Sequence, residues 1–377
     1  MSDLTPVSPA AAPASAVATP APRVYNKGFS QVKDIFNKIY QSRANLGLPN
    51  PGTTENINKE VSRDVLLTPF FFTGLKADVS KSFSLQPVFQ VSHALALGSP
   101  VLPNYAFGSA YANENTMMQG NIESDLSLTG RAQRVWNSAH TSRAQFQLGD
   151  SQPAALVQLE HDYLGPDFSL TLRALNPSIT SGTLSGVYTG SLLQSVTKKL
   201  ALGIETLYSM PASKEVPSDV STSYFARYTS TNWIASVQAR GTGQTVLSFY
   251  KKIADKVEAG IETEIGPNPN AMLLGTGNLI DGTTSIGAKY EFRQSIFRGK
   301  IDSTGKVSCL VERQVLPILA LSFAGEIDHV AKTAKVGLGL QIEAGSEEVF
   351  EQQMQLQQQM ANAGAGAGTG APSTPSA

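Results

Sequence analysis

Acidic side chains recur at every second position in parts of this sequence, where they alternate with apolar residues. Between residues 257 and 265, for example, Glu258, Glu262 and Glu264 share one parity and aliphatic residues dominate the other. Neighbouring side chains on a β-strand point to opposite faces, so these carboxylates would line a single face. Each would attract a cation at contact by only about 1 kcal/mol in water. The pattern therefore offers weak, repeated attraction of positive charge rather than bond-making chemistry.

Assigning faces by parity along the chain turns a set of acids toward one polar side. We predict that these acids attract cationic cargo along a path: Asp78, Glu160, Asp162, Glu312, Glu326, Asp328 and Glu343. Weak attraction at many points suits transit, because tight binding would stop it. The alternative is that each acid merely pairs with a neighbouring base and keeps the polar side wet.

Arg313 departs from this pattern. Val307, Cys309 and Val311 face the apolar side, and parity places Arg313 there as well. A charge on that side is costly at the centre of a bilayer but tolerated near its surface. We expect Arg313 to contact a partner or a lipid headgroup, or simply to extend its charged end to the interface.

The histidines and the cysteine do not form a pattern typical of an enzyme site. His161 and Asp162 are adjacent, as are Asp328 and His329, and neighbours on a strand cannot act together as a base and its orienting acid. Cys309 is the single cysteine, which excludes an intramolecular disulfide framework and a metal site built from several cysteines. We expect no catalytic residue, no metal site and no cofactor.

The elements that would position these residues are β-strands. From about residue 70 to residue 345 the apolar residues follow a period of two, and turn residues such as Gly165-Pro166 and Asp281-Gly282 separate the segments. At about 14 residues per strand and turn, this region would hold roughly 18 to 20 antiparallel strands. So many strands in one sheet should close into a barrel.

The apolar face of such a barrel needs a partner. No helical pattern lies between residues 70 and 345 to cover it, so we expect it to meet lipid while the polar face surrounds water. No window has 18 or more consecutive apolar residues, so spanning helices are not expected. A soluble lipid-binding β-protein is an alternative to the membrane barrel. Alkaline extraction of membranes would test it, because a soluble protein is released and a barrel stays in the membrane.

The chain outside the barrel has a different composition. Residues 1–22 are rich in Ala and Pro and predict a disordered tail, and residues 346–377 are Gln-rich and then Gly/Ala-rich. Residues 23–66 predict a helical extension, with one helix over 29–40 and a second over about 54–66. In the second helix, Thr54 is the candidate N-cap and Glu55 lies near the N-terminal dipole.

Several stretches also carry a family resemblance. NPGTTENINKEVSRDVLLTPFFFTGLKADVSKSF, from Asn50 to Phe83, resembles the central channel subunit of the translocase of the mitochondrial outer membrane. Further similar stretches are LLQSVTKKLALGIETLYS (192–209), VEAGIET (257–263), GAKYEFRQSIFRGKIDSTGKV (287–307) and GEIDH (325–329). The resemblance covers roughly residues 50 to 345.

This resemblance implies an all-β transmembrane barrel of 19 strands with the second helix inside the pore. It implies a channel that imports unfolded precursor proteins with cationic presequences across the mitochondrial outer membrane. In that family lumen acids attract presequences, and Asp78, Glu312 and Glu343 occupy matching positions. The implied partners are receptors, small single-helix subunits, phospholipid and a second barrel in a homodimer. An anion-type metabolite porin of the mitochondrion is the alternative, because it shares the barrel.

The last strand resembles the sorting signal of mitochondrial barrels. Lys335 is the polar residue, Gly337 follows two positions later, and Leu340 and Ile342 are the hydrophobic positions. An ordinary alternating edge strand would look similar.

The net charge of −1 gives no reason to expect a nucleic-acid partner.

Overall fold

The computed structural model describes residues 43, 46–149, 155–178, 185–211, 217–268 and 279–345. The predicted tails, at 1–22 and 346–377, and the predicted helix at 29–40 lie outside the described residues. The chain divides into two compact units, Met1–Gly47 and Leu48–Ala377. The strands and the segment they enclose belong to the second unit.

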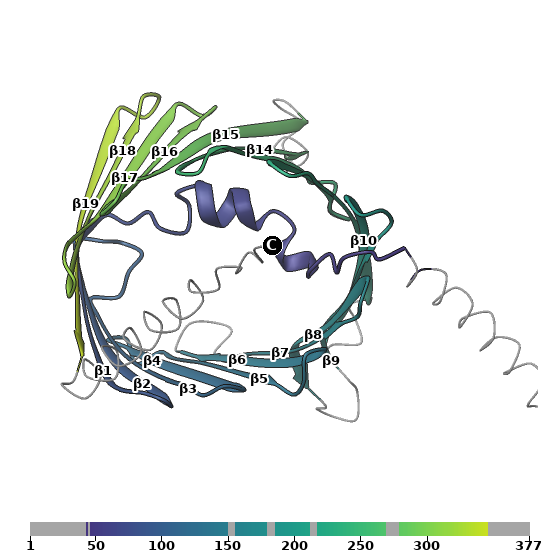
Figure 1. The fold of residues 1–377 in the computed structure, drawn as a ribbon, viewed down its shortest axis with the longest axis horizontal. Coiled ribbons are helices and arrows are strands. Elements are labelled where there is room, and N and C mark those ends of the chain that lie inside the picture. Colours follow the sequence, from purple (N-terminus) through teal and green to yellow (C-terminus); the bar gives the residue numbers. More distant parts are fainter. Residues whose placement is uncertain are drawn as a thin grey trace, which may run out of the picture. The chain divides into compact units, whose positions relative to one another are not determined.

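The described residues of this unit form one 19-stranded sheet that closes into a barrel (Figure 1). Consecutive strands pair antiparallel, and β1 pairs in parallel with β19 to complete the ring. The strands are β1 (Gly74–Leu85), β2 (Val88–Leu97), β3 (Tyr105–Ala112), β4 (Thr116–Glu123), β5 (Leu128–Val135), β6 (His140–Leu148), β7 (Ala155–Leu164), β8 (Phe168–Ser178), β9 (Ser185–Ser195), β10 (Leu200–Met210), β11 (Asp219–Thr229), β12 (Trp233–Ala239), β13 (Thr245–Ala254), β14 (Val257–Pro267), β15 (Ile280–Glu291), β16 (Ser295–Asp302), β17 (Lys306–Leu316), β18 (Leu319–Asp328) and β19 (Thr333–Gly345). The predicted transmembrane barrel of about 19 strands is confirmed.

The parallel β1–β19 pair follows from the odd strand number. Strands that alternate in direction bring the first and the nineteenth to the seam pointing the same way, and parallel pairing is the only bonding left to them. Leu340 then lies beside Ala77, and Ile342 beside Val79, so the apolar face continues across the seam.

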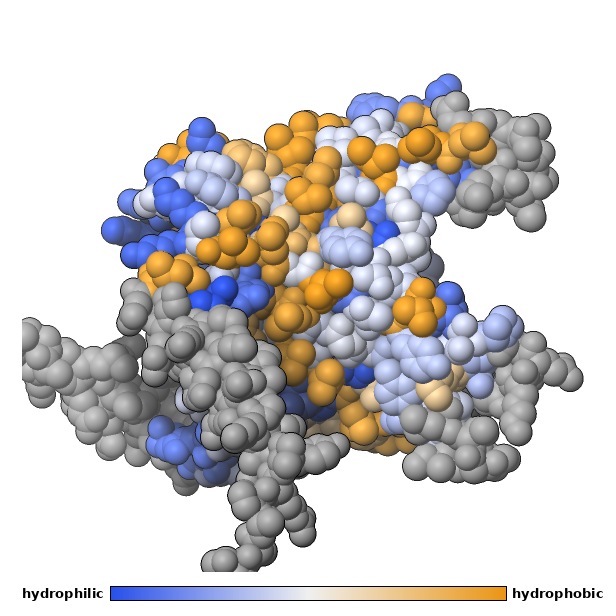
Figure 2. Space-filling view, turned by 90° about the vertical axis from the view of Figure 1, so that its right-hand side faces the viewer, coloured by the Kyte–Doolittle hydropathy of each residue, from blue (hydrophilic) through white to orange (hydrophobic). Residues whose placement is uncertain are grey.

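The outer face of the barrel is apolar. Leu202, Ile204, Tyr224, Ile286 and Phe323 are among the large apolar side chains that remain exposed there. Figure 2 views the side around β10, where apolar side chains spread over the outer surface between weakly polar ones. No helix in the described part of the chain is long and apolar enough to cross a membrane.

A segment that precedes β1 lies inside the ring (Figure 1). It contains a 3₁₀ turn, η1 (Thr54–Asn56), and a π-helical turn, η2 (Glu60–Val65). The position agrees with the predicted second helix, but the helix is not one continuous α-helix over 54–66. Thr53 rather than Thr54 is the N-cap of η1, and its side chain makes no capping hydrogen bond.

The hydrophobic core lies between this segment and the inner wall. Ile57 packs in one cluster with Leu193 and Phe225, and Leu67 packs in another with Leu310 and Ala324. The apolar stripe of the segment is thus buried although the lumen around it is polar. The segment is held against the wall by apolar contact as well as by hydrogen bonds.

Candidate functional site: the lumen wall

The contacts of the internal segment identify the lumen face of each strand. A Cβ at Gly260 would meet Val61, and one at Gly287 would meet Leu66, so these two glycines face inward. Residues directly paired across neighbouring strands share a face. The register then places all the predicted path acids on the lumen side.

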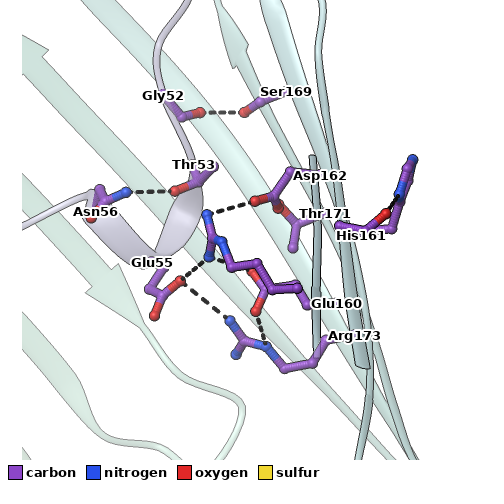
Figure 3. A network of polar contacts seen from close by, with 12 residues as sticks. Gly52, Thr53, Glu55, Asn56, Glu160, His161, Asp162, Ser169, Thr171 and Arg173 are labelled. Carbon is purple, nitrogen blue, oxygen red and sulfur yellow. Dashed lines mark hydrogen bonds and ion pairs between the residues drawn. The ribbon is translucent and has the colours of Figure 1, made fainter. Parts of the chain in front are cut away.

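Glu160 and Asp162 lie in a network of ion pairs (Figure 3). Arg143 on β6 lies 3.0 Å from Glu160 and 2.8 Å from Asp162, and Arg173 on β8 lies 3.5 Å from Glu160. Thr171 donates a 2.6 Å hydrogen bond to Asp162. Both acids are buried, so their charges are neutralised inside the wall.

Glu55 from η1 joins the same network. Its carboxylate lies 3.3 Å from Arg143 and 3.6 Å from Arg173. The sequence suggested a helix-dipole role for this residue, whereas the structure uses it to attach the internal segment to the wall. Parity turns Arg143 and Arg173 toward the same face as the acids, but their pairing with Glu55 could not be identified from sequence because it depends on where the segment lies.

Hydrogen bonds fix the entry of the segment beside β7–β9. Asn50 donates to the main-chain oxygen of Gly165 at 2.5 Å, and Ser195 donates to that of Pro49 at 2.7 Å. The hydroxyl of Ser169 donates to the main-chain oxygen of Gly52. The chain therefore enters the ring at a defined place.

Arg227 on β11 was not singled out from the sequence. Its guanidinium donates to the main-chain oxygens of Asn56 at 2.9 Å and Ile57 at 3.0 Å, and it pairs with Glu60 at 2.7 Å. On β14, Glu262 accepts a 3.1 Å hydrogen bond from Asn58. Together these contacts bind both ends of the turn between η1 and η2 to the wall.

Two other predicted acids lie near the end of the internal segment. Arg298 on β16 pairs with Glu312 at 2.6 Å, and its guanidinium lies 4.4 Å from the centre of the Phe70 ring. Asp78 on β1 pairs with Lys76 at 2.8 Å. A cavity of about 660 Å³ is lined by Asp78, Glu312 and the aromatic side chains of Phe70, Phe71 and Phe72. The structure therefore brings these two acids together beside an aromatic surface.

The remaining predicted acids differ in surroundings. Glu326 lies 3.3 Å from Lys335. Asp328 accepts main-chain hydrogen bonds from Val330 at 3.0 Å and Ala331 at 2.8 Å, which fix the β18–β19 turn. Glu343 is exposed near the end of β19, and no ion pair links its side chain to a described residue. These acids thus do not form one continuous row of free carboxylates.

The turn acid Asp125, between β4 and β5, resembles Asp328. It accepts a 2.9 Å hydrogen bond from the main-chain N–H of Ser127. That hydrogen bond lowers the pKa of the Asp125 carboxyl below its ordinary value. The Asp125 carboxylate thus stabilises the β4–β5 turn.

The residues of the predicted sorting signal occupy both faces of β19. Lys335 and Gly337 face the lumen, whereas Leu340 and Ile342 face outward beside β1. Gly337 is buried, and a Cβ there would clash with the main-chain oxygen of Phe72. Arg313 on β17 is exposed on the outward face, paired with Leu321. Close approach of the internal segment gives a structural reason for glycine at 337.

The described residues contain no group of three or more His, Cys, Asp or Glu that could hold a metal ion.

Comparison with known proteins places the chain in a family. The eukaryotic porin family matches residues 50–337. The mitochondrial import receptor subunit TOM40 of Saccharomyces cerevisiae is 47% identical over 335 residues, which cover 86% of this chain and 86% of the yeast protein. The tom40 subunit of Neurospora crassa is 42% identical, covering 87% of this chain and 93% of that protein. A probable TOM40-2 of Arabidopsis thaliana is 30% identical, covering 81% and 95%. The chain therefore belongs to the eukaryotic porin family and, within it, to the family of mitochondrial import receptor subunit TOM40.

Proposed function

We propose that the chain is the protein-conducting channel through which unfolded precursor proteins with cationic presequences cross the mitochondrial outer membrane. The observation that carries this proposal is the 47% identity, over most of both chains, to a protein named as a mitochondrial import receptor subunit. The 19-stranded barrel with an apolar outside and a polar inside supplies a path across a membrane. The family is one of porins rather than of enzymes.

The cavity beside Phe70, Phe71 and Phe72 is the place where we expect a presequence to dock. A cationic amphipathic helix has one apolar face and one basic face, and the cavity offers aromatic rings together with Asp78 and Glu312. Both acids already contact a base, so an arriving lysine or arginine would share rather than create an ion pair. Each contact would then contribute at most about 1 kcal/mol, which favours passage over retention.

Glu343 is the acid with the most open surroundings. It is exposed near the end of β19, close to the seam with β1, where Ser80 is its neighbour in register. We propose that Glu343 extends the cationic path beyond Asp78 and Glu312 toward one rim. Glu160 and Asp162 are better explained as acids that hold the internal segment, because two arginines neutralise them.

The partners are proposed from the family resemblance. We propose that the chain works in a translocase complex with receptors and small single-helix subunits, and that two barrels associate. The apolar outer face gives such helices and lipids a surface, and Arg313 on that face can bind a lipid headgroup or a partner carboxylate.

A metabolite or anion-type porin of the same membrane is the second candidate, because the matching family is described only as eukaryotic porin. Planar-bilayer recording with a presequence peptide separates the two functions. A precursor channel should show voltage-dependent block by the peptide and no block by a peptide whose basic residues are replaced by glutamine. An anion-selective pore with no block by either peptide would contradict the proposal.

The acids are tested in the same recordings. The triple variant Asp78→Asn, Glu312→Gln, Glu343→Gln should lower cation selectivity and weaken peptide block about tenfold, since three contacts of about 0.5 to 1 kcal/mol are lost. The control is Glu114→Gln with Asp255→Asn, which removes exposed acids from turns outside the lumen wall. Equal block in the two variants would remove the three acids from the path.

A further inference from the structure

The charged side chains on the outward face of the described strands share one sign. They are Lys81 on β1, Arg134 on β5, Lys251 on β13 and Arg313 on β17, and the register turns every acid of the described strands toward the lumen. All four bases lie toward the C-terminal end of an odd-numbered strand. Odd strands run in the same direction, so the bases gather at one rim of the barrel.

Arg134 borders a groove on the outer face of the barrel. The groove has a volume of about 810 Å³ and crosses the outer face from β4 to β10. Its floor consists of small residues that leave room beside larger neighbours: Ala132, Ala144, Ala174 and Gly190. Leu159 and Leu172 stand beside this floor. An apolar groove on a surface that faces lipid suits hydrocarbon chains.

A cluster of polar and aromatic groups lies along the groove near the basic rim, and Arg134, Ser142 and His161 of this cluster line the groove. The Arg134 guanidinium lies 4.5 Å from the centre of the Trp136 ring, and Trp136 donates a 2.9 Å hydrogen bond to Ser142. Ser142 lies 2.9 Å from Nδ1 of His161, whose Nε2 lies 3.2 Å from Nδ1 of His140. Figure 3 shows His161 on the opposite side of its strand from Glu160 and Asp162. The cluster therefore belongs to the membrane side of the wall.

The Arg134 guanidinium makes no ion pair with any described residue. The ring of Trp136 lies against one side of it, and the Arg134 N–H donors remain available near the C-terminal end of β5. A guanidinium binds phosphate oxygens with two parallel hydrogen bonds. A ligand for this groove would carry a phosphate that binds the guanidinium and a hydrocarbon part that fills the apolar floor.

We propose that this groove is a binding site for an anionic glycerophospholipid. The phosphate contacts Arg134 at the rim, and the acyl chains lie over Ala132, Ala144, Ala174 and Gly190. The absence of outward acids among the described strands favours an anionic lipid over a zwitterionic one, because nothing there would bind a headgroup cation. A spanning helix of another protein could use the small-residue floor, but it would pair with the guanidinium only if it carried a carboxylate at the rim, whereas an anionic lipid always brings its phosphate there.

The test uses the full chain, purified with its bound partners and reconstituted in nanodiscs of equal phosphatidylcholine and phosphatidylglycerol. Native mass spectrometry after detergent release measures the retained lipid. We expect one retained phosphatidylglycerol, and we expect Arg134→Gln to lower its retention about tenfold or more, the effect of losing a charge-assisted hydrogen bond. Arg131→Gln, on the lumen face of the same strand, is the matched control and should retain the lipid.

A second variant tests the acyl end without touching the charge. Ala144→Leu fills the groove and should also release the lipid, whereas Ala288→Leu, which is exposed on the outward face of β15, should not. Equal retention of both lipid classes, unchanged retention in Arg134→Gln, or displacement of a co-purified polypeptide instead of lipid by Ala144→Leu would each overturn the proposal.

Discussion

Arg143 and Glu160 face each other across β6 and β7, and their charged groups lie 3.0 Å apart inside the lumen wall. Glu55 of the internal segment reaches the same guanidinium at 3.3 Å. One arginine thus links a buried acid of the wall with an acid of the segment. The Arg143–Glu160 pair therefore stabilises the wall and the internal segment, and it affects transport only through their position.

Glu160→Gln should destabilise the barrel. The substitution leaves Arg143 and Arg173 with less negative charge around them, and removing one partner of a buried ion pair costs about 3 to 5 kcal/mol. Urea unfolding of the purified chain in detergent, followed by tryptophan fluorescence, measures the loss. Glu114→Gln, an exposed turn acid, is the control. A midpoint that does not move in Glu160→Gln would show that the network adds nothing to stability.

Arg227→Gln should loosen the internal segment without unfolding the barrel. The arginine provides two main-chain hydrogen bonds and the ion pair with Glu60. Losing them should raise the opening of residues 54–66 about tenfold, the equivalent of one charge-assisted hydrogen bond. Hydrogen exchange of the amides in that segment reports the change.

The control for Arg227→Gln is Arg240→Gln, whose guanidinium contacts Gln244 at a turn. Exchange of residues 54–66 should stay at the unmodified rate in this control. If both variants exchange alike, the segment is held by apolar contact alone.

Gly287→Val should push the segment away from the wall. A Cβ at this position would already lie 2.8 Å from Leu66, and a valine adds two methyl groups there. Overpacking of this kind costs about 1 to 3 kcal/mol. Gly299→Val on the outward face of neighbouring β16 is the matched control, because its Cβ would meet only Phe297 at 3.4 Å or more. Thermal unfolding should separate the two variants, and equal midpoints would contradict the packing of Leu66.

Gly337 and Leu340 test whether the sorting pattern is a signal or a packing requirement. Gly337→Ala should slow refolding of the purified chain into detergent micelles, where no assembly machinery is present, because the methyl group meets Phe72. Leu340→Ala faces outward and should refold normally but assemble slowly into isolated mitochondria. Normal refolding of Gly337→Ala would leave the signal as the reason for its glycine.

Alternation was sufficient to predict the faces of the strands. Asp78, Glu312 and Glu343 were assigned inward from parity, and the register agrees, because a strand has only two sides. The number of strands could not be predicted from composition and spacing alone, which allowed 18 to 20. Only the pairing of the first strand with the last, β1 with β19, fixes the number. The family resemblance implied 19 strands.

The ion-pair partners could not be predicted. For Glu160 and Asp162 the sequence left open whether they attract cargo or pair with a neighbouring base. It gives no register between β6, β7 and β8, and the register is what places Arg143 and Arg173 beside them. Arg227 carried no signal, since its partners are main-chain oxygens of a segment distant in sequence. The apolar stripe of that segment predicted its burial, but the local 3₁₀ and π geometry arises from its contacts with the wall.

Photo-crosslinking from neighbouring positions of β19 to a precursor arrested during import tests the account most directly. Gln341 lies beside Asp78 on the lumen face, and Ile342 lies beside Val79 on the outward face. With a photoreactive residue at each position in turn, passage through the lumen should give a precursor adduct from 341 and none from 342. Adducts of equal yield from both positions, or from 342 alone, would contradict passage through the lumen.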